Sequence, residues 1–168
     1  VCSRCIMPST IPEISFDKNG VCTYCRIHDK MERKYPTGKE GERILLKIAE
    51  KVKHAGRGRK YDCVIGVSGG CDSSYLLYIA KEIMGLRPLA VHFDNTWDST
   101  IAVENIHNML SKLDIDLYTY VIDNEEFNDI SRAFLLASVP EIDAPTDVAL
   151  TTVLYIAARK YRVKYIFN

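Results

Sequence analysis

The sequence predicts an α/β protein in which a doubly wound parallel sheet follows a small cysteine-rich module. From Tyr61 onward, short apolar runs alternate with longer segments of helical periodicity, a pattern typical of βαβ units. A glycine-rich segment, residues 66–74, stands between the first apolar run and the helix that follows it. Two Cys-x-x-Cys pairs lie within residues 1–25.

Composition divides the 168 residues into three zones. Residues 1–36 hold four cysteines and three prolines but few periodic apolar positions, which indicates a loop-rich module that a hydrophobic core does not hold together. Residues 37–60 are a linker with a helix over 38–54. Residues 61–168 form the main domain. We expect this domain to continue past Asn168, because the chain stops at the carboxyl edge of a strand, where ligands bind in open α/β sheets.

Within residues 61–168, the pattern predicts strands over 62–67, 88–93, 116–122 and 164–167. It predicts helices over 72–84, 99–113, 125–137 and 147–160. In the first of these helices, Leu77, Ala80 and Ile83 are among the residues expected to face inward. Thr146 or Asp147, after a proline, is expected to cap the last helix.

Hydrophobic residues make up 47% of the chain and charged residues 26%, as in soluble globular proteins. No run approaches the roughly 18 apolar residues of a membrane span, and the N-terminus does not resemble a signal peptide, so we expect a cytoplasmic protein without a membrane partner. The formal net charge is zero, which argues against general binding of nucleic acid. Residues 26–60 nevertheless carry 12 Lys/Arg against 5 Asp/Glu. A solvated helix face explains this run most simply, and a basic surface for a nucleotide or RNA is the alternative.

The four N-terminal cysteines have the spacing of a zinc site. Cys2-x-x-Cys5 and Cys22-x-x-Cys25 are separated by 16 residues, which lets two turns offer four thiolates to one tetrahedral ion. Four such ligands leave no open position, so the expected role is structural Zn²⁺. An iron–sulfur cluster or unrelated thiols are the alternatives. His28 lies just beyond the second pair and is interpreted as a solvent-facing residue, although it could replace one ligand.

The glycine-rich segment has the residues that a phosphate site needs. Gly69 and Gly70 allow backbone N–H groups to approach phosphate oxygens, and the start of the following helix adds unpaired donors. Hydroxyl groups of Ser68, Ser73 and Ser74 can donate further hydrogen bonds. A carboxylate would repel phosphate, so the acidic residue at position 72 should either cap the helix or hold a Mg²⁺ ion.

The segment is neither a Walker A motif, because it has no lysine, nor G-x-G-x-x-G. The string S-G-G-x-D-S-S, residues 68–74, resembles the PP-loop of the ATP-pyrophosphatases, and a tight strand-to-helix turn is the alternative. The resemblance implies a Rossmann-like domain of the adenine nucleotide alpha hydrolase type that binds ATP with Mg²⁺ and transfers AMP to a substrate oxygen. It implies catalytic roles for Asp72 and Ser73. It also implies nucleotide binding by these residues: Val67, Ser68, Gly69, Gly70, Asp72, Ser73 and Ser74.

The end of the second predicted strand is where this fold meets the adenosine. We therefore expect Phe93 and Asp94 to bind the nucleotide. An acidic residue at a strand end is also a common turn former, so this alternative stays open for Asp94. His92 is a weaker candidate.

The whole chain resembles the bacterial N-acetyl sugar amidotransferases. The resemblance rests on the residue 66–74 loop and on three further motifs: C-x-R-C-x-x-P at 2–8, I-P with I-x-F-D at 11–17, and G-V-C-x-x-C at 20–25. It implies a cytoplasmic enzyme that converts the N-acetyl group of a nucleotide-activated sugar into an acetamidino group, for lipopolysaccharide O-antigen or flagellar glycans. ATP would activate the acetamido oxygen, ammonia would displace it, and AMP and pyrophosphate would leave.

The resemblance also implies a partner. No glutaminase is evident in the chain, since Cys2 follows Val1 and belongs to the zinc pairs, so we expect a separate glutaminase subunit to supply the ammonia. Two other functions stay open. One is a tRNA-thiolating PP-loop enzyme that would use the basic stretch on RNA, and the other is a nucleotide-binding module without catalysis.

Overall fold

The computed structural model describes residues 1–168, which form two compact units, residues 1–46 and 47–168. Helix α2 (Gly38–Ala55) runs across the division between them. The three zones predicted from the sequence, residues 1–36, 37–60 and 61–168, have other boundaries than these two units, and this division of the chain stays a prediction. None of the helices combines the length and the apolar character that crossing a membrane requires.

The first unit consists of turns, one complete helix and the start of α2. Asp17 fixes a turn, because its carboxylate accepts hydrogen bonds from the N–H groups of Asn19 and Val21 at 2.8 and 3.0 Å. An isolated antiparallel bridge pairs Phe16 with Cys22, and helix α1 (Thr23–Lys34) starts directly after it. The sequence predicted a loop-rich module here. Helix α1 was missed although its apolar residues Tyr24, Ile27 and Met31 recur at helical spacing, and it buries none of its residues.

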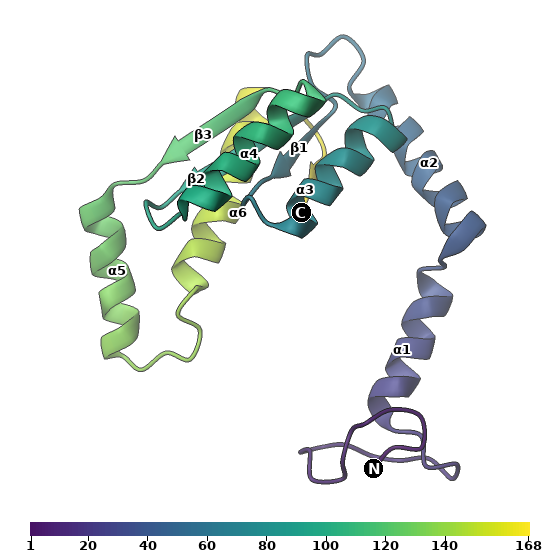
Figure 1. The fold of residues 1–168 in the computed structure, drawn as a ribbon. Coiled ribbons are helices and arrows are strands. Elements are labelled where there is room, and N and C mark those ends of the chain that lie inside the picture. The colour runs from purple at the N-terminus through teal and green to yellow at the C-terminus, as the bar shows by residue number, and fades with distance from the viewer. The chain divides into compact units, whose positions relative to one another are not determined.

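The second unit contains a four-stranded parallel sheet, as predicted (Figure 1). Its strands are β1 (Cys63–Gly66), β2 (Pro88–Asp94), β3 (Leu117–Val121) and β4 (Ile166–Phe167), in the spatial order β3-β2-β1-β4. All four residues of β1 are buried, because this central strand is covered on both faces. In the register of the sheet, Ile65 pairs with Ala90 on one side and with Phe167 on the other.

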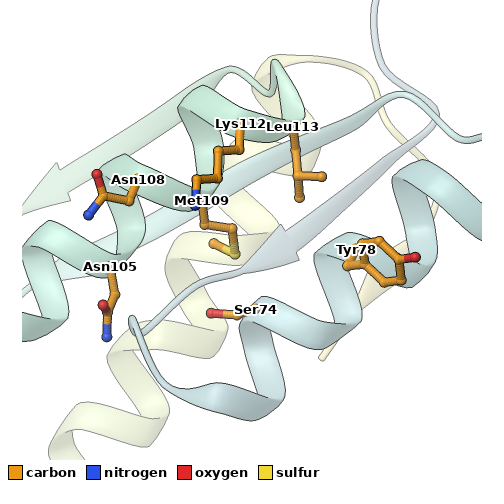
Figure 2. Close-up of a pocket in the computed structure, with 7 residues that line it drawn as sticks. All are labelled: Ser74, Tyr78, Asn105, Asn108, Met109, Lys112 and Leu113. Atoms are coloured by element: carbon orange, nitrogen blue, oxygen red, sulfur yellow. The ribbon is translucent and has the colours of Figure 1, made fainter.

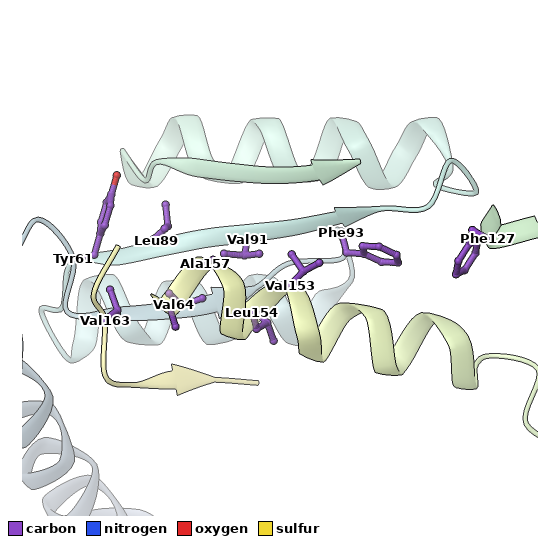
Figure 3. Close-up of a cluster of buried hydrophobic side chains, with 11 residues drawn as sticks. Tyr61, Val64, Leu89, Val91, Phe93, Phe127, Val153, Leu154, Ala157 and Val163 are labelled. Carbon is purple, nitrogen blue, oxygen red and sulfur yellow. The ribbon is translucent and has the colours of Figure 1, made fainter. Parts of the chain in front are cut away.

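Helices cover both faces of the sheet, which confirms the doubly wound α/β class. Helices α3 (Cys71–Tyr78) and α4 (Thr100–Leu113) lie on one face, and α6 (Ala144–Lys160) lies on the other (Figures 1 and 3). Helix α5 (Asn124–Leu136) extends beyond the end of the sheet and buries little besides Phe127.

The main hydrophobic core lies between the sheet and α6 (Figure 3). Helix α6 contributes small and branched side chains that pack on β1 and β2. The buried cluster consists of Tyr61, Val64, Leu89, Val91, Phe93, Phe127, Val153, Leu154, Ala157, Ala158 and Val163. Because side chains of β1 and β2 are packed in this core, the core holds in place the strand ends from which the loops at the carboxyl side of the sheet start.

Two local predictions were wrong. The first predicted helix is interrupted by a π-helical turn, η1 (Ile79–Ile83), which shifts the register of the residues after it. Ile83 is therefore 44% exposed, and Met84, at 3%, takes the inward position. Helix α6 begins at Ala144 after Asp143, so Thr146 and Asp147 lie within its first turn and do not cap it.

Candidate functional site

The strand order places a topological switch point at β1. From β1 the chain proceeds to β2 and β3 on one side, and β4 then pairs with the other side of β1. In doubly wound sheets, ligands bind outside the carboxyl ends of the strands at such a point. A cavity of about 360 Å³ lies there, lined by Gly66, Ser68, Asp72, Ser73, Leu76 and Asn168. The glycine-rich loop therefore borders a cavity at the position where the fold binds ligands.

A second, smaller cavity of about 120 Å³ adjoins the first, and Ser68 lines both. Its walls come from the ends of β1 and β2, the loop after β2 and the start of α6. They are formed by Val67, Ser68, His92, Phe93, Asn95, Asp98, Thr146 and Leu150. The structure thus brings the glycine-rich loop together with the end of the second strand, as the sequence predicted.

The N-terminus of α3 has no side-chain cap. Gly70 is the N-cap residue and offers no oxygen to the N–H groups of the first turn. In contrast, Ser99 caps α4 and Asp123 caps α5 with a side-chain hydrogen bond. The first-turn donors of α3, together with the helix dipole, are therefore available to an anion.

Serine hydroxyls surround the loop but bind its backbone only loosely. The N–H of Ser68 donates to the hydroxyl of Ser73 at 3.3 Å, and the N–H of Gly70 donates to the hydroxyl of Ser68 at 3.4 Å. Both distances exceed the usual range for such bonds, so an anion could replace these contacts at little cost. The hydroxyl of Ser74 instead donates to the carbonyl of Gly70 at 2.7 Å, and Ser74 lines a separate groove between α3 and α4 (Figure 2).

Asp72 is exposed, makes no hydrogen bond or ion pair, and borders the larger cavity. It does not cap α3, because Gly70 holds that position. Of the two roles that the sequence left open, helix capping is thus excluded. The carboxylate is free to bind a cation beside the glycine-rich loop, and carboxylate oxygens are ligands that Mg²⁺ prefers.

His92 and Asp98 form a partly buried pair in the smaller cavity. The ring Nδ1 of His92 lies 3.1 Å from the carbonyl oxygen of Val67, so this nitrogen carries a proton and donates it. The other ring nitrogen lies 3.3 Å from Oδ2 of Asp98, an oxygen that makes no hydrogen bond of good geometry. His92 was only a weak candidate from the sequence and Asp98 was not a candidate, since no local pattern shows that the loop after β2 folds back onto the strand.

Phe93 and Asp94, the two residues predicted to bind the nucleotide at the end of β2, have different surroundings from each other. Phe93 is buried, lines the smaller cavity and packs edge-on against Phe127, with ring centroids 6.1 Å apart. Asp94 lines neither cavity. Its carboxylate accepts the N–H of Thr96 at 2.8 Å and so stabilises the turn after the strand. Nucleotide binding by Asp94 stays a prediction, and turn formation is the role that the structure supports.

The four N-terminal cysteines converge in the first unit. The Sγ atoms of Cys2, Cys5, Cys22 and Cys25 all lie within 4.8 Å of one another. The Sγ atoms of Cys5 and Cys22 are 3.6 Å apart, close to the roughly 3.8 Å that tetrahedral geometry with Zn–S bonds of about 2.3 Å requires. The donor set therefore fits a zinc ion of the closed, structural type.

Backbone donors surround the cysteine sulfurs. Sγ of Cys2 accepts the N–H groups of Arg4 and Cys22 at 3.4 and 3.2 Å. Burial acts to raise the pKa of Cys2, but hydrogen bonds from Arg4, Cys22 and Cys5 outweigh it and lower the pKa to about 6. Hydrogen bonding to Cys5, with burial, raises the pKa of Cys25 to about 12. Without a cation, the four sulfur atoms are too close together for all of them to ionise, so the arrangement suits a bound metal cation.

His28 is not part of the sulfur cluster. Its Nδ1 atom lies 3.7 Å from a carboxylate oxygen of Glu32, one turn further along α1, and its side chain is 63% exposed. The predicted solvent-facing role of His28 agrees with this position.

The chain matches no family model. An uncharacterized protein of Methanocaldococcus jannaschii is 31% identical over 135 residues, which cover 77% of this chain and 44% of that protein. A tRNA(Ile)-lysidine synthase of Chlamydia pneumoniae is 32% identical over 92 residues, which cover 48% of this chain and 28% of the synthase. The chain thus spans less than half the length of these relatives.

Solved structures show the same fold. An NMN synthetase from Francisella tularensis superposes with a TM-score of 0.51 at 23% identity, over 76% of this chain and 52% of that one. An NH3-dependent NAD synthetase from Campylobacter jejuni superposes with a TM-score of 0.52 at 16% identity, over 73% of this chain and 54% of that one. The chain therefore shares the α/β fold of these two synthetases.

Proposed function

We propose that this chain is the nucleotide-binding part of an ATP-dependent ligase that forms AMP and pyrophosphate. One observation carries the proposal: an uncapped helix N-terminus, two adjacent glycines and serine hydroxyls converge on a cavity at the switch point of a parallel sheet. Backbone donors in such a place bind phosphate groups. The fold shared with NMN and NAD synthetases supports this reading.

In the proposed complex, the β and γ phosphates of ATP lie against the N–H groups of the loop and of the first turn of α3. The hydroxyl of Ser73, which borders the larger cavity, donates to a phosphate oxygen. The carboxylate of Asp72 holds Mg²⁺, which would neutralise phosphate charge when bound. The adenosine extends into the smaller cavity beside Phe93. Positioning and charge neutralisation then favour attack on the α phosphorus, with pyrophosphate as the leaving group.

For the substrate, we propose the N-acetyl group of a nucleotide-activated sugar. The acetamido oxygen attacks the α phosphorus and releases pyrophosphate. Ammonia then adds to the carbon, and AMP leaves with that oxygen, so that C=O becomes C=NH. The support is the resemblance of the cysteine module and the loop to N-acetyl sugar amidotransferases. A separate glutaminase subunit would supply the ammonia, and lipopolysaccharide or flagellar glycan synthesis would use the product.

ATP–pyrophosphate exchange tests the proposal. The protein, with Mg²⁺, is incubated with labelled pyrophosphate and with nucleotide sugars that do or do not carry an N-acetyl group. Label should enter ATP only with the N-acetyl sugars, and added ammonia should lower the mass of the sugar by the difference between O and NH. Exchange without dependence on an N-acetyl group would exclude the sugar substrate but keep the ligase. Nucleotide binding without any exchange would indicate a binding module.

A second candidate is an RNA-modifying ligase of the same fold. Two observations favour it: the 32% identity to a tRNA(Ile)-lysidine synthase, and the basic residues Arg26, Lys30, Arg33 and Lys34, whose spacing places them along one side of α1. Filter binding with tRNA over a salt series separates the candidates. An RNA enzyme should bind with an affinity that falls steeply with salt, because phosphate contacts release counterions. A sugar enzyme should show only weak, nonspecific retention.

A further inference from the structure

Two carbonyl groups of the phosphate loop are held by side chains from outside the loop. The carbonyl oxygen of Val67 accepts a hydrogen bond from Nδ1 of His92, which lies on β2, at 3.1 Å. The carbonyl oxygen of Gly69 accepts one from Nδ2 of Asn105, which lies on α4, at 3.1 Å. The loop is therefore fixed at alternate peptide groups by two other elements of the fold.

Peptide geometry gives these two bonds a directional consequence. In a trans peptide, the C=O of one residue and the N–H of the next point in opposite directions. A donor that binds the carbonyl oxygen of Val67 therefore makes the N–H of Ser68 point away from that donor. In the same way, a donor to the carbonyl oxygen of Gly69 makes the N–H of Gly70 point away from it. These two N–H groups make the long contacts to serine hydroxyls, at 3.3 and 3.4 Å. Both are thus directed toward the hydroxyls beside the proposed phosphate position.

Helix α4 holds the loop at a second point as well. Gly69 has a φ of +73° and approaches the helix so closely that a Cβ on it would lie 2.7 Å from Cα of Ala102. Asn105 follows Ala102 by one helical turn. Figure 2 shows the side chain of Asn105 at the loop end of α4, whereas Asn108 lies further along the same helix. Backbone contact and amide donor together fix the position and the rotation of the Gly69–Gly70 peptide.

We propose that Asn105 is a positioning residue for nucleotide binding: its amide holds the Gly69 carbonyl so that the N–H of Gly70 faces the phosphates. This inference rests on the proposed function, because it assigns to Asn105 a role in the same site. Asn105 touches no reacting atom and acts only through the orientation of the peptide. In the phosphate loop, a flipped peptide would present a carbonyl oxygen to an anion, which is repulsive.

Substitutions at Asn105 separate the donor from the size of the side chain. Asn105→Asp keeps the shape but replaces the donor by an acceptor, and Asn105→Gln keeps an amide donor. The matched control is Asn108→Asp, because Asn108 lies one turn away on the same helix and makes no hydrogen bond. Three properties are measured for each variant: the ATP affinity by calorimetry with Mg²⁺, hydrogen exchange at the amides of residues 68–72 in the free protein, and the thermal unfolding temperature.

We expect Asn105→Asp to weaken ATP binding about tenfold, the equivalent of one lost hydrogen bond, and to speed exchange at the loop amides. Asn105→Gln should keep part of the ATP affinity and part of the protection from exchange, and Asn108→Asp should change neither the affinity nor the exchange. A merely structural role for Asn105 predicts that affinity follows thermal stability instead of the presence of a donor. Wild-type affinity and exchange in Asn105→Asp would contradict the inference.

The affinity and exchange measurements also separate this inference from the proposed function. If the wild-type protein bound no ATP, the result would contradict both the proposed function and the role of Asn105 in nucleotide binding. If the wild type bound ATP and Asn105→Asp bound it equally well, the result would contradict only the role of Asn105. Exchange in the free protein would show in either case whether Asn105 fixes the loop.

Discussion

A Cβ atom on Gly69 would lie 2.3 Å from the carbonyl oxygen of Ala102, closer than side-chain atoms approach backbone in proteins. The neighbouring Gly70 is different, since a Cβ there would meet only the hydroxyl oxygen of Ser68, at 3.3 Å. Gly70 also has φ −81° and ψ 169°, which any residue can adopt. The first glycine is therefore required by the fold, and the second faces the space where we place the phosphates.

Alanine substitutions should separate these two requirements. Gly69→Ala should lower the free energy of unfolding by about 2–4 kcal/mol, because it adds both backbone strain and a clash with α4. Gly70→Ala should leave stability nearly unchanged but weaken ATP binding, since its methyl group occupies the space of a phosphate oxygen. Denaturant unfolding and calorimetry measure the two effects. Equal behaviour of the two variants in both assays would contradict this division of roles.

Asp72→Asn should strongly slow ATP–pyrophosphate exchange without affecting the fold. The carboxylate makes no hydrogen bond and no ion pair, so its loss removes no stabilising contact. If it holds Mg²⁺, exchange should fall by about 100-fold or more, as expected for the loss of a charge-stabilising group in phosphoryl transfer. Asp129→Asn, at an exposed position on α5, is the control of equal charge. Retained exchange in Asp72→Asn would remove this residue from the catalytic set.

Much of this arrangement was predictable because it depends on local pattern. The buried apolar run before residues 66–74 and the amphipathic helix after them predicted β1, the loop and α3, and the cysteine spacing predicted the sulfur cluster. Asn105 was not predictable, because its partner Gly69 lies 36 residues earlier and only the packing of α4 brings them together. The π-helical turn after Tyr78 was missed because it leaves no distinctive apolar period. Helix α1 was missed because it lies within residues 1–36, whose cysteines and prolines were interpreted as a loop-rich module.

Removal of zinc should unfold the first unit and leave the second intact. Residues 1–46 bury few side chains besides Cys2 and Cys22, so metal ligation supplies the stability that a core would otherwise give. Purified protein should contain one zinc per chain, and Cys22→Ser should lose it. Cys71→Ser, which changes an exposed thiol outside the cluster, should keep it. Elemental analysis and circular dichroism before and after chelation measure this, and a metal-free protein with unchanged helix content would contradict it.

Asp116 should make a small contribution to stability that acid removes. Hydrogen bonds from Lys60 and then Tyr61 lower the pKa of Asp116, and the contacts are 2.9 and 2.7 Å long. A lowered folded pKa means that the contribution is present above the unfolded value of about 4 and is lost as pH falls through the folded value. Because the side chain of Asp116 is 54% exposed, we expect only about 0.5 kcal/mol. Asp116→Asn should therefore lower stability at pH 7 and not at pH 2, as measured by urea unfolding.

The ion pair of Asp62 and Arg87 should stabilise the start of the sheet without influencing the site. Asp62 is 3% exposed, and its carboxylate receives Nη2, Nε and the backbone N–H of Arg87 at 2.6, 3.1 and 2.9 Å. The same guanidinium donates to the carbonyl of Gly56, where a Cβ would clash with Asp62. The pair thus connects the segment before β1 to the start of β2, at the amino ends of the strands and away from the glycine-rich loop.

Arg87→Ala should cost about 3–5 kcal/mol, because it leaves the carboxylate of Asp62 buried without its charged partner. Asp62→Ala should cost less than this, because Arg87 is half exposed and can turn to water. The double variant should then be less destabilised than the sum of the two single variants, since the unpaired carboxylate is gone. Additive losses in denaturant unfolding would show that the pair is not coupled. Unchanged ATP affinity in all three variants is expected, because neither residue lies at the carboxyl ends of the strands.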